Sequence, residues 1–83
     1  MKILYFAWLR QRTGIGEEEV ELPGDVETVG DLVAWLSARG EGYEHAFAEP
    51  AAVRSAVDQV QVPLDASIRR AREVAFFPPM TGG

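Results

Sequence analysis

The residues best suited to chemistry are the last ones of the chain. An apolar run is followed by two prolines, and the sequence then ends in a diglycine; these residues are Glu73–Phe77, Pro78, Pro79, Met80, Thr81, Gly82 and Gly83. A terminal carboxylate with almost no side chains around it can enter another protein's active site and serve there as a chemical handle. We therefore expect Gly83 to be the reactive residue of this protein.

The segment from Pro78 to Gly83 is suited to insertion into a deep pocket. Its six residues, at about 3.3 to 3.6 Å each, extend to roughly 20 Å. Pro78 and Pro79 fix φ and favour an extended chain, which lowers the entropy lost on insertion. Gly82 and Gly83 let a narrow channel close around their backbone. We predict a folded domain over residues 1–77 and an inserting tail over residues 78–83; the alternative is a terminus without a role.

Outside the tail, the sequence indicates no catalytic group. His45 is the single histidine and lies in an Ala- and Glu-rich segment, where a surface or packing role is expected. Glu17-Glu18-Glu19 lacks the spacing of metal ligands, and we interpret it as a solvated strand edge that discourages edge pairing. With no nucleophile-base pair and no metal site, the chain is expected to be inactive alone and to act as a co-substrate.

Composition is that of one small globular domain. The 83 residues are 47% hydrophobic and 25% charged, with no cysteine for disulfides or thiolate metal sites. No apolar run approaches the roughly 20 residues that span a bilayer, and no signal peptide is evident, so we expect a cytoplasmic protein without a membrane partner. A net charge of −5 argues against nucleic acid as the partner. The one dense basic cluster, Arg69, Arg70 and Arg72, is expected in a solvated loop.

Local patterns predict the elements that position the tail. Aromatic and β-branched residues over 2–9, turn residues over 13–16 and alternation over 17–22 predict an N-terminal hairpin. Thr28, with Asp31 three residues later, can cap a helix that Gly40 ends. A short helical turn is expected over 43–48, and strands over 52–57, 60–62 and 73–77. The predicted order is β-β-α-β-β-β.

A helix with one apolar stripe is most easily buried across one face of a single mixed sheet. This arrangement is an α+β fold, the β-grasp, with its first and last strands parallel and adjacent at the centre. Strand alternation directs Phe6, Trp8 and Phe77 to the face opposite the helix. We interpret them as an apolar partner interface. The alternatives are a sheet that bends enough to bury these rings, or a loop that covers them.

Three segments together resemble a known family. They are the apolar first strand ending near Ala7 and Arg10, the turn Val57-Asp58-Gln59, and the ending over residues 73–83. The chain resembles the small subunits of molybdopterin synthase, sulfur carriers of the MoaD/ThiS family with a ubiquitin-like β-grasp fold, over essentially its whole length. Two positions differ from the family's usual pattern: Asp58 stands where Asn is common, and Ala71-Arg72 where Gly-Asp is usual.

The resemblance implies a reaction at Gly83. A carboxylate is a poor electrophile, so an ATP-dependent, E1-like adenylating enzyme would first convert Gly83 to an acyl adenylate, and a persulfide donor would then give a thiocarboxylate. The carrier, with no bound cofactor or metal, would dock on the large catalytic subunit of molybdopterin synthase. There it would deliver sulfur to cyclic pyranopterin monophosphate, forming the molybdopterin dithiolene in molybdenum cofactor biosynthesis. The implied assembly is a heterotetramer of two small and two large subunits.

Two other functions remain open at this point. A related sulfur carrier for thiamine thiazole synthesis uses the same tail chemistry with a different acceptor, although the Phe-Phe-Pro-Pro-x-Thr segment favours molybdopterin synthase. A ubiquitin-like modifier would instead join Gly83 to lysines of target proteins. Lys2 is the only lysine, which restricts chain building on the protein itself but leaves conjugation to other proteins open.

Overall fold

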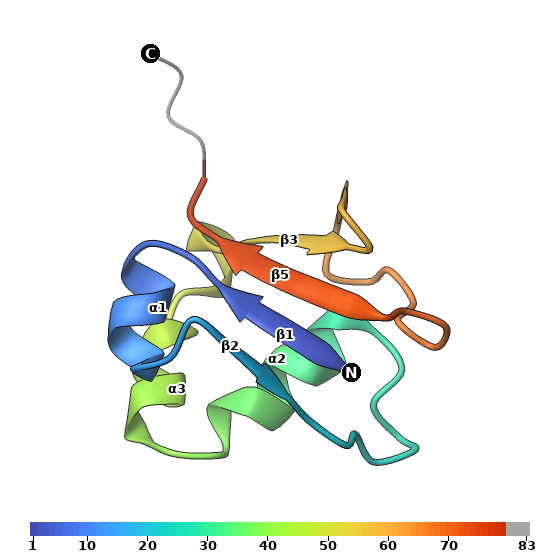
Figure 1. Cartoon of the computed structure of the whole chain (residues 1–83), viewed down its shortest axis with the longest axis horizontal. Helices are drawn as coiled ribbons and strands as arrows, with labels where there is room; N and C mark the ends of the chain where they lie inside the picture. The colour runs from blue at the N-terminus through green and yellow to red at the C-terminus, as the bar shows by residue number, and fades with distance from the viewer. Residues whose placement is uncertain (80–83) are drawn as a thin grey trace.

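The computed structural model describes residues 1–79, so the predicted tail residues Met80, Thr81, Gly82 and Gly83 lie outside the described residues. The elements are β1 (Lys2–Tyr5), α1 (Trp8–Thr13), β2 (Glu17–Glu19), α2 (Val29–Ser37), α3 (Glu41–Ala46), the 3₁₀ helix η1 (Pro50–Ala52), β3 (Arg54–Val57), β4 (Val60–Val62) and β5 (Glu73–Phe77). The five strands form one sheet in the order β2-β1-β5-β3-β4. Figure 1 shows α2 behind this sheet, with α1 and α3 toward one end.

The predicted β-grasp arrangement is confirmed at the centre of the sheet. β1 and β5 are parallel, with Lys2 opposite Glu73 and Tyr5 opposite Phe76. β2 is antiparallel to β1, β3 is antiparallel to β5, and β4 is antiparallel to β3. The last strand of the described chain is therefore bonded on both sides.

Helix α2 begins at the predicted cap. Thr28 Oγ1 accepts the Asp31 N–H at 3.1 Å, and the Asp31 carboxylate accepts the Thr28 N–H at 3.2 Å. This reciprocal capping box satisfies two backbone donors at the start of the helix. The residues that face the sheet are buried and follow helical spacing: Val29, Leu32, Val33 and Leu36.

The predicted strand over residues 2–9 is wrong in its second half. β1 ends at Tyr5, and α1 begins at Trp8. Leu9, expected on a strand, lies on the buried side of α1 with 0% exposure. Trp8 therefore does not continue the outward-facing alternation that Phe6 follows, and its predicted place on the outer face is wrong.

The first strand ends early because its parallel partner runs into a proline. The Phe6 N–H donates to the Phe76 carbonyl at 3.0 Å. In this register the Phe6 carbonyl would next accept an N–H from residue 78, but Pro78 has none. It accepts the Leu9 N–H instead, at 3.2 Å, and Ala7 turns the chain into α1 with a positive φ of 54°.

Other predicted boundaries shift by a few residues, while β4 and β5 are confirmed as predicted. β2 is shorter than the predicted 17–22, and β3 begins at Arg54 because residues 50–52 form η1. α2 ends at Ser37, where its apolar spacing has run out, and Gly40 instead precedes α3. The predicted helical turn over 43–48 is observed as α3.

The core fills one face of the sheet. Side chains from β1 and β5 meet the α2 stripe and buried residues of α1, α3 and the loops; the fully buried larger ones are Tyr5, Phe76, Ile3, Leu9, Leu32, Leu36, Val29 and Val74. Phe76 lies against Phe47, with ring centroids 4.9 Å apart, and against Tyr5 at 6.3 Å. Within residues 1–79, no helix is long and apolar enough to cross a membrane.

Candidate functional site

The predicted tail leaves the sheet at the end of β5. Phe77 is the last strand residue and pairs with Arg54 of β3, whereas Pro78 and Pro79 lie beyond the strand. Neither proline has an N–H, so neither can extend the ladder on either side. The red ribbon past the β5 arrow in Figure 1 marks this point, which we call the tail base (Phe77, Pro78 and Pro79).

The outer face of the sheet carries the predicted apolar patch in part. Phe76 is buried on the helix side, so its neighbour Phe77 points to the opposite face. One step beyond the β1–β5 register, Phe6 stands opposite Phe77, and 49% of Phe6 is exposed. Within the described residues, neither a bend of the sheet nor a loop buries Phe6. We call this surface the outer patch; by register it comprises Leu4, Phe6, Ala56, Ala75 and Phe77.

Charged residues surround the outer patch. The Lys2 Nζ lies 3.5 Å from a Glu17 carboxylate oxygen. Glu73 stands opposite Lys2, and Arg54 stands opposite Phe77. An apolar centre with a charged rim is the usual composition of a protein interface. The outer patch therefore has the character of a docking surface at the tail base.

Trp8, the third predicted interface residue, lies on a different surface. α1 carries it off the strand, and its half-buried ring packs against the core. The Arg12 guanidinium carbon lies 4.5 Å from the centroid of the Trp8 ring. Together these two residues line a hollow with His45 of α3. The structure thus brings Phe6 and Phe77 together and places Trp8 around the end of the sheet.

The remaining candidates show no sign of catalysis. His45 is exposed, as predicted, and so are all three arginines of the basic cluster before β5. In the part of the chain that the structure describes, no group of three or more histidine, aspartate or glutamate side chains is placed to hold a metal ion. The tail base and the outer patch are therefore the candidate site that the described residues offer.

Comparison with known proteins decides the family. The ThiS family matches residues 3–83 of this chain. The chain belongs to the ThiS family. The molybdopterin synthase sulfur carrier subunits of Escherichia coli and Haemophilus influenzae are 35% and 30% identical to it over 83 residues, covering 100% of this chain and 99% of each relative. A solved structure from Pyrococcus furiosus, a candidate molybdopterin converting factor, subunit 1, is 34% identical with a TM-score of 0.75 and covers 95% of each chain. The predicted MoaD/ThiS membership and ubiquitin-like fold are confirmed.

In this ThiS family member, the two departures from the usual sequence meet at one place. Asp58 and Gln59 form the turn between β3 and β4, with positive φ values of 47° and 73°, a region that Asp enters almost as readily as Asn. The Asp58 carboxylate accepts the N–H groups of Arg72 at 2.9 Å and Glu73 at 3.0 Å. Asp58 therefore fixes the start of β5. The sequence indicates that an Asp occupies a tight turn, but it does not indicate its hydrogen-bond partners, Arg72 and Glu73, because they are distant in sequence.

The interpretation of Glu18 as part of a solvated strand edge is wrong. It stands opposite Ile3 and so faces the core side of the sheet. Its carboxylate accepts hydrogen bonds from Tyr5, Tyr43 and Arg39, each at 2.8 Å. Burial by itself would raise the pKa of Glu18, but these three hydrogen bonds outweigh burial and hold the pKa below its ordinary value. Burial and the same carboxylate raise the pKa of Tyr5. The cluster ties β1, β2 and α3 together.

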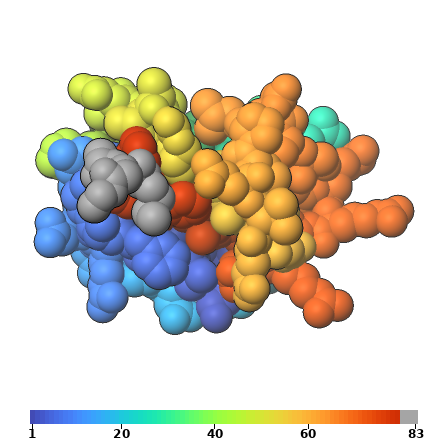
Figure 2. Space-filling view, turned by 90° about the horizontal axis from the view of Figure 1, so that it is seen from above, coloured from blue at the N-terminus to red at the C-terminus, as the bar shows by residue number. Residues whose placement is uncertain are grey.

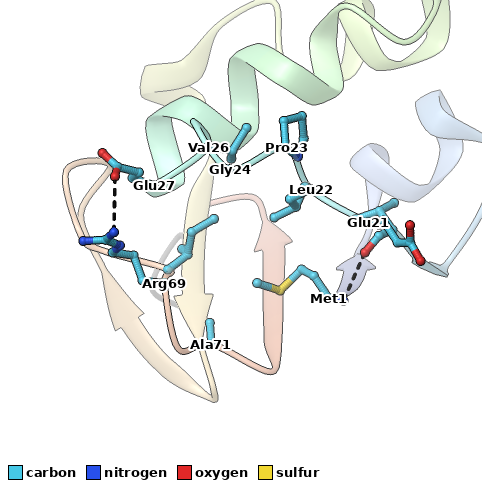
Figure 3. A pocket seen from close by; sticks show the side chains of 11 residues that line it. Met1, Glu21, Leu22, Pro23, Gly24, Val26, Glu27, Arg69 and Ala71 are labelled. Carbon is cyan, nitrogen blue, oxygen red and sulfur yellow. Dashed lines mark hydrogen bonds and ion pairs between the residues drawn. The ribbon is translucent and has the colours of Figure 1, made fainter.

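A hollow of about 430 Å³ lies at the opposite end of β5 from the tail base. Its walls come from the N-terminus, the loop after β2 and the loop before β5: Met1, Val20, Glu21, Leu22, Pro23, Gly24, Val26, Glu27, Ile68, Arg69 and Ala71. Figure 3 shows the ion pair between Glu27 and Arg69, at 3.7 Å, on one side of it. Because this hollow lies at the opposite end of β5 from Phe77, we assign the candidate site to the tail base and the outer patch.

Proposed function

We propose that this chain is the sulfur carrier small subunit of a molybdopterin synthase and that it acts through Gly83. The observation that carries the proposal is its likeness, over 100% of its length, to two proteins named molybdopterin synthase sulfur carrier subunits. The tail base and the outer patch support it, because a carrier needs a docking face and an accessible chain end rather than a catalytic cleft.

In the proposed activation, an E1-like enzyme joins the Gly83 carboxylate to AMP from ATP and releases pyrophosphate. The terminal sulfur of a persulfide then attacks the acyl carbon, and AMP leaves. A thiol cleaves the S–S bond of the acyl disulfide, which leaves a thiocarboxylate on Gly83. The proposal assigns no proton transfer to a side chain of the carrier; the activating enzyme and the sulfur donor supply those groups.

In the proposed transfer, the outer patch docks on the large catalytic subunit, and the tail enters that subunit's active site. The thiocarboxylate sulfur forms a bond to an oxygen-bearing carbon of cyclic pyranopterin monophosphate, and the oxygen on that carbon leaves. Water then hydrolyses the resulting thioester, which releases the original carboxylate and leaves the sulfur on the pterin. Two such deliveries supply the two sulfur atoms of the dithiolene. Phe6 and Phe77 provide apolar contact, while Pro78 and Pro79 keep the start of the tail clear of the sheet.

The intact mass of the chain tests this proposal. After incubation with ATP, an adenylating enzyme and a sulfide source, the mass is expected to rise by the exchange of one oxygen for sulfur, located at Gly83. Adding the large subunit and cyclic pyranopterin monophosphate should then restore the original mass and yield molybdopterin.

Other results would contradict the proposal. A sulfur gain that is never passed to the pyranopterin but supports thiazole formation would favour the thiamine-pathway carrier. Isopeptide bonds from Gly83 to lysines of other proteins, without a sulfur gain, would favour the modifier. The chain lacking Gly83 is the matched control, because it should show neither change.

A further inference from the structure

A second hollow, of about 360 Å³, lies just beyond the end of the sheet from which the tail departs. We call it the Trp8 hollow. Its walls come from α1, from α3 and from the segment that leads into and forms η1; they are Trp8, Arg12, His45, Ala48, Glu49 and Ala52.

The Trp8 hollow lies near the tail base, although none of the tail-base residues lines it. Trp8 follows Phe6 by two residues, and Ala52 precedes Arg54 by two. Phe6 and Arg54 stand on the two sides of Phe77, one in the β1 register and one in the β3 register. Seen from above in Figure 2, red atoms at the end of β5 lie between blue atoms of the N-terminal segment and yellow atoms of the segment after α3.

The walls of this hollow combine apolar surface with one stacked cation. The Arg12 guanidinium covers the Trp8 ring at 4.5 Å, and its Nη1 donates to the His45 carbonyl at 3.3 Å. A guanidinium has several N–H groups, so others can still receive a carboxylate. Ala48 and Ala52 leave room for an aliphatic stem, and Glu49 limits the space for a second acid.

The short tail brings any partner that encloses Gly83 close to the tail base. Four residues follow Pro79 in the sequence, and fully extended they reach about 13 to 14 Å. A pocket that encloses Gly83 must therefore bring its mouth to Pro78 and Pro79. The outer patch includes Phe77, and two residues that line the Trp8 hollow follow or precede the strand neighbours of Phe77 by two positions. A pocket mouth wider than the tail would therefore meet both surfaces.

We propose that the Trp8 hollow is a second docking surface for the large catalytic subunit, occupied by a carboxylate side chain from the rim of its tail pocket. The carboxylate binds Arg12, and its stem packs on Trp8 and Ala48. This inference rests on the proposed function, which supplies the partner. We assign it to the large subunit because the relatives are named as subunits of the synthase, and a lasting complex benefits most from a second contact. Two contacts near the tail base fix the direction in which the tail enters.

The test is the affinity of carrier variants for the purified large subunit, measured by calorimetric titration. Ala48→Glu fills the hollow and offers Arg12 a carboxylate of its own, while Arg12→Glu reverses the charge. Ala34→Glu is the matched control, because Ala34 is also exposed but lies on α2. We expect the first two changes to weaken binding about tenfold or more, and the control to stay within about twofold. Circular dichroism and thermal unfolding confirm that each variant is folded.

Three results would overturn this inference in distinguishable ways. If Ala48→Glu and Arg12→Glu bind with unchanged affinity while Phe77→Asp binds more weakly, the Trp8 hollow is not a docking surface. The proposed function is then unaffected. Normal binding to the large subunit with slower adenylation assigns the hollow to the activating enzyme. If the unaltered chain does not bind the large subunit at all, the proposed function fails and this docking surface fails with it.

Discussion

The two ends of β5 are built in opposite ways. At its start, the Asp58 carboxylate holds the N–H groups of Arg72 and Glu73, and the Lys2 N–H donates to the Arg72 carbonyl at 3.1 Å. At its end, Pro78 and Pro79 offer no N–H, so the ladder stops within one residue. One end is anchored by a side chain, and the other is released by the backbone itself.

This difference suits the proposed function, in which a reactive chain end is joined to a rigid fold. β5 lies in the middle of the sheet, and its residues Val74 and Phe76 are 0% exposed. The last fixed residue therefore has a defined position, and the tail begins from it without an intervening loop. Five experiments test how far the two ends differ, beginning with the largest expected effect.

Deleting Gly83 should abolish sulfur transfer and leave the anchored end untouched. The residue that accepts AMP and sulfur in the proposed reaction would be lost, while every described contact of β5 remains. Thiocarboxylate formation is followed by intact mass, and the fold by thermal unfolding. Retained sulfur transfer would show that the chemistry does not occur at the chain end.

Phe76→Ala and Phe77→Asp compare the two faces of the strand just before its release. Phe76 is fully buried, so its truncation should lower the free energy of unfolding by about 3 to 5 kcal/mol. Phe77 lies on the outer patch, so Phe77→Asp should leave the chain folded and weaken binding to the large subunit about tenfold or more. Denaturant titration and calorimetry measure the two effects. Equal loss of stability in both variants would remove the distinction between the faces.

Asp58→Ala tests the anchored end. It removes the acceptor of two backbone hydrogen bonds and leaves alanine at a positive φ of 47°, so the free energy of unfolding should fall by about 2 kcal/mol. Asp58→Asn is the matched control, because its amide oxygen can accept the same bonds and asparagine tolerates this φ. Chemical denaturation should place Asp58→Asn within about 0.5 kcal/mol of the unaltered chain.

Glu18→Gln tests whether side-chain hydrogen bonds also stabilise β1 and β2, the strands on one side of β5. Because hydrogen bonds hold the pKa of Glu18 below the ordinary value of 4.5, the carboxylate stabilises the fold fully above pH 4.5. That contribution is lost as the pH falls through the folded-state pKa. We expect the variant to be less stable by about 1 kcal/mol at pH 7, after allowing for partial solvent screening. Denaturation series at several pH values should show the difference shrinking in acid; a constant difference would argue against an ionised Glu18.

Ala7→Gly probes the released end and should have the smallest effect. Ala7 has a positive φ of 54° beside the tail base, a region that glycine enters without steric cost. Relief of this strain, partly offset by the greater freedom of unfolded glycine, should raise the free energy of unfolding by about 0.5 kcal/mol. A lower thermal midpoint would mean that the methyl group of Ala7 makes a contact worth more than the strain.

Sequence patterns predicted the fold where the determining contacts are local. The cap of α2 depends on residues three apart, and β5 is an apolar run ended by its own prolines. Phe6-Ala7-Trp8-Leu9, by contrast, suits a strand and a helix equally well. Pro78, at the other end of the chain, decides that this segment does not continue the strand, because Pro78 cannot donate the next hydrogen bond of the ladder.

Residues of the candidate site also differ in whether their roles depend on neighbours in sequence or on distant residues. The tail could be proposed from the sequence because its expected chemistry resides in consecutive residues, and its role stays a prediction. Asp58 and Glu18 could not be proposed in this way, because their roles depend on groups brought close only by the sheet. Three consecutive glutamates give no alternation signal, so nothing in the sequence marks the middle one, Glu18, as facing inward.

The central position of β5 also has a consequence for synthesis of the chain on the ribosome. β1 and β3 are joined only through β5, so the two halves of the sheet stay apart until residue 77 has been translated. A nascent chain interrupted earlier lacks the strand that completes the core and should be cleared by proteases. A folded chain has therefore been translated at least as far as Phe77, the residue directly before the prolines.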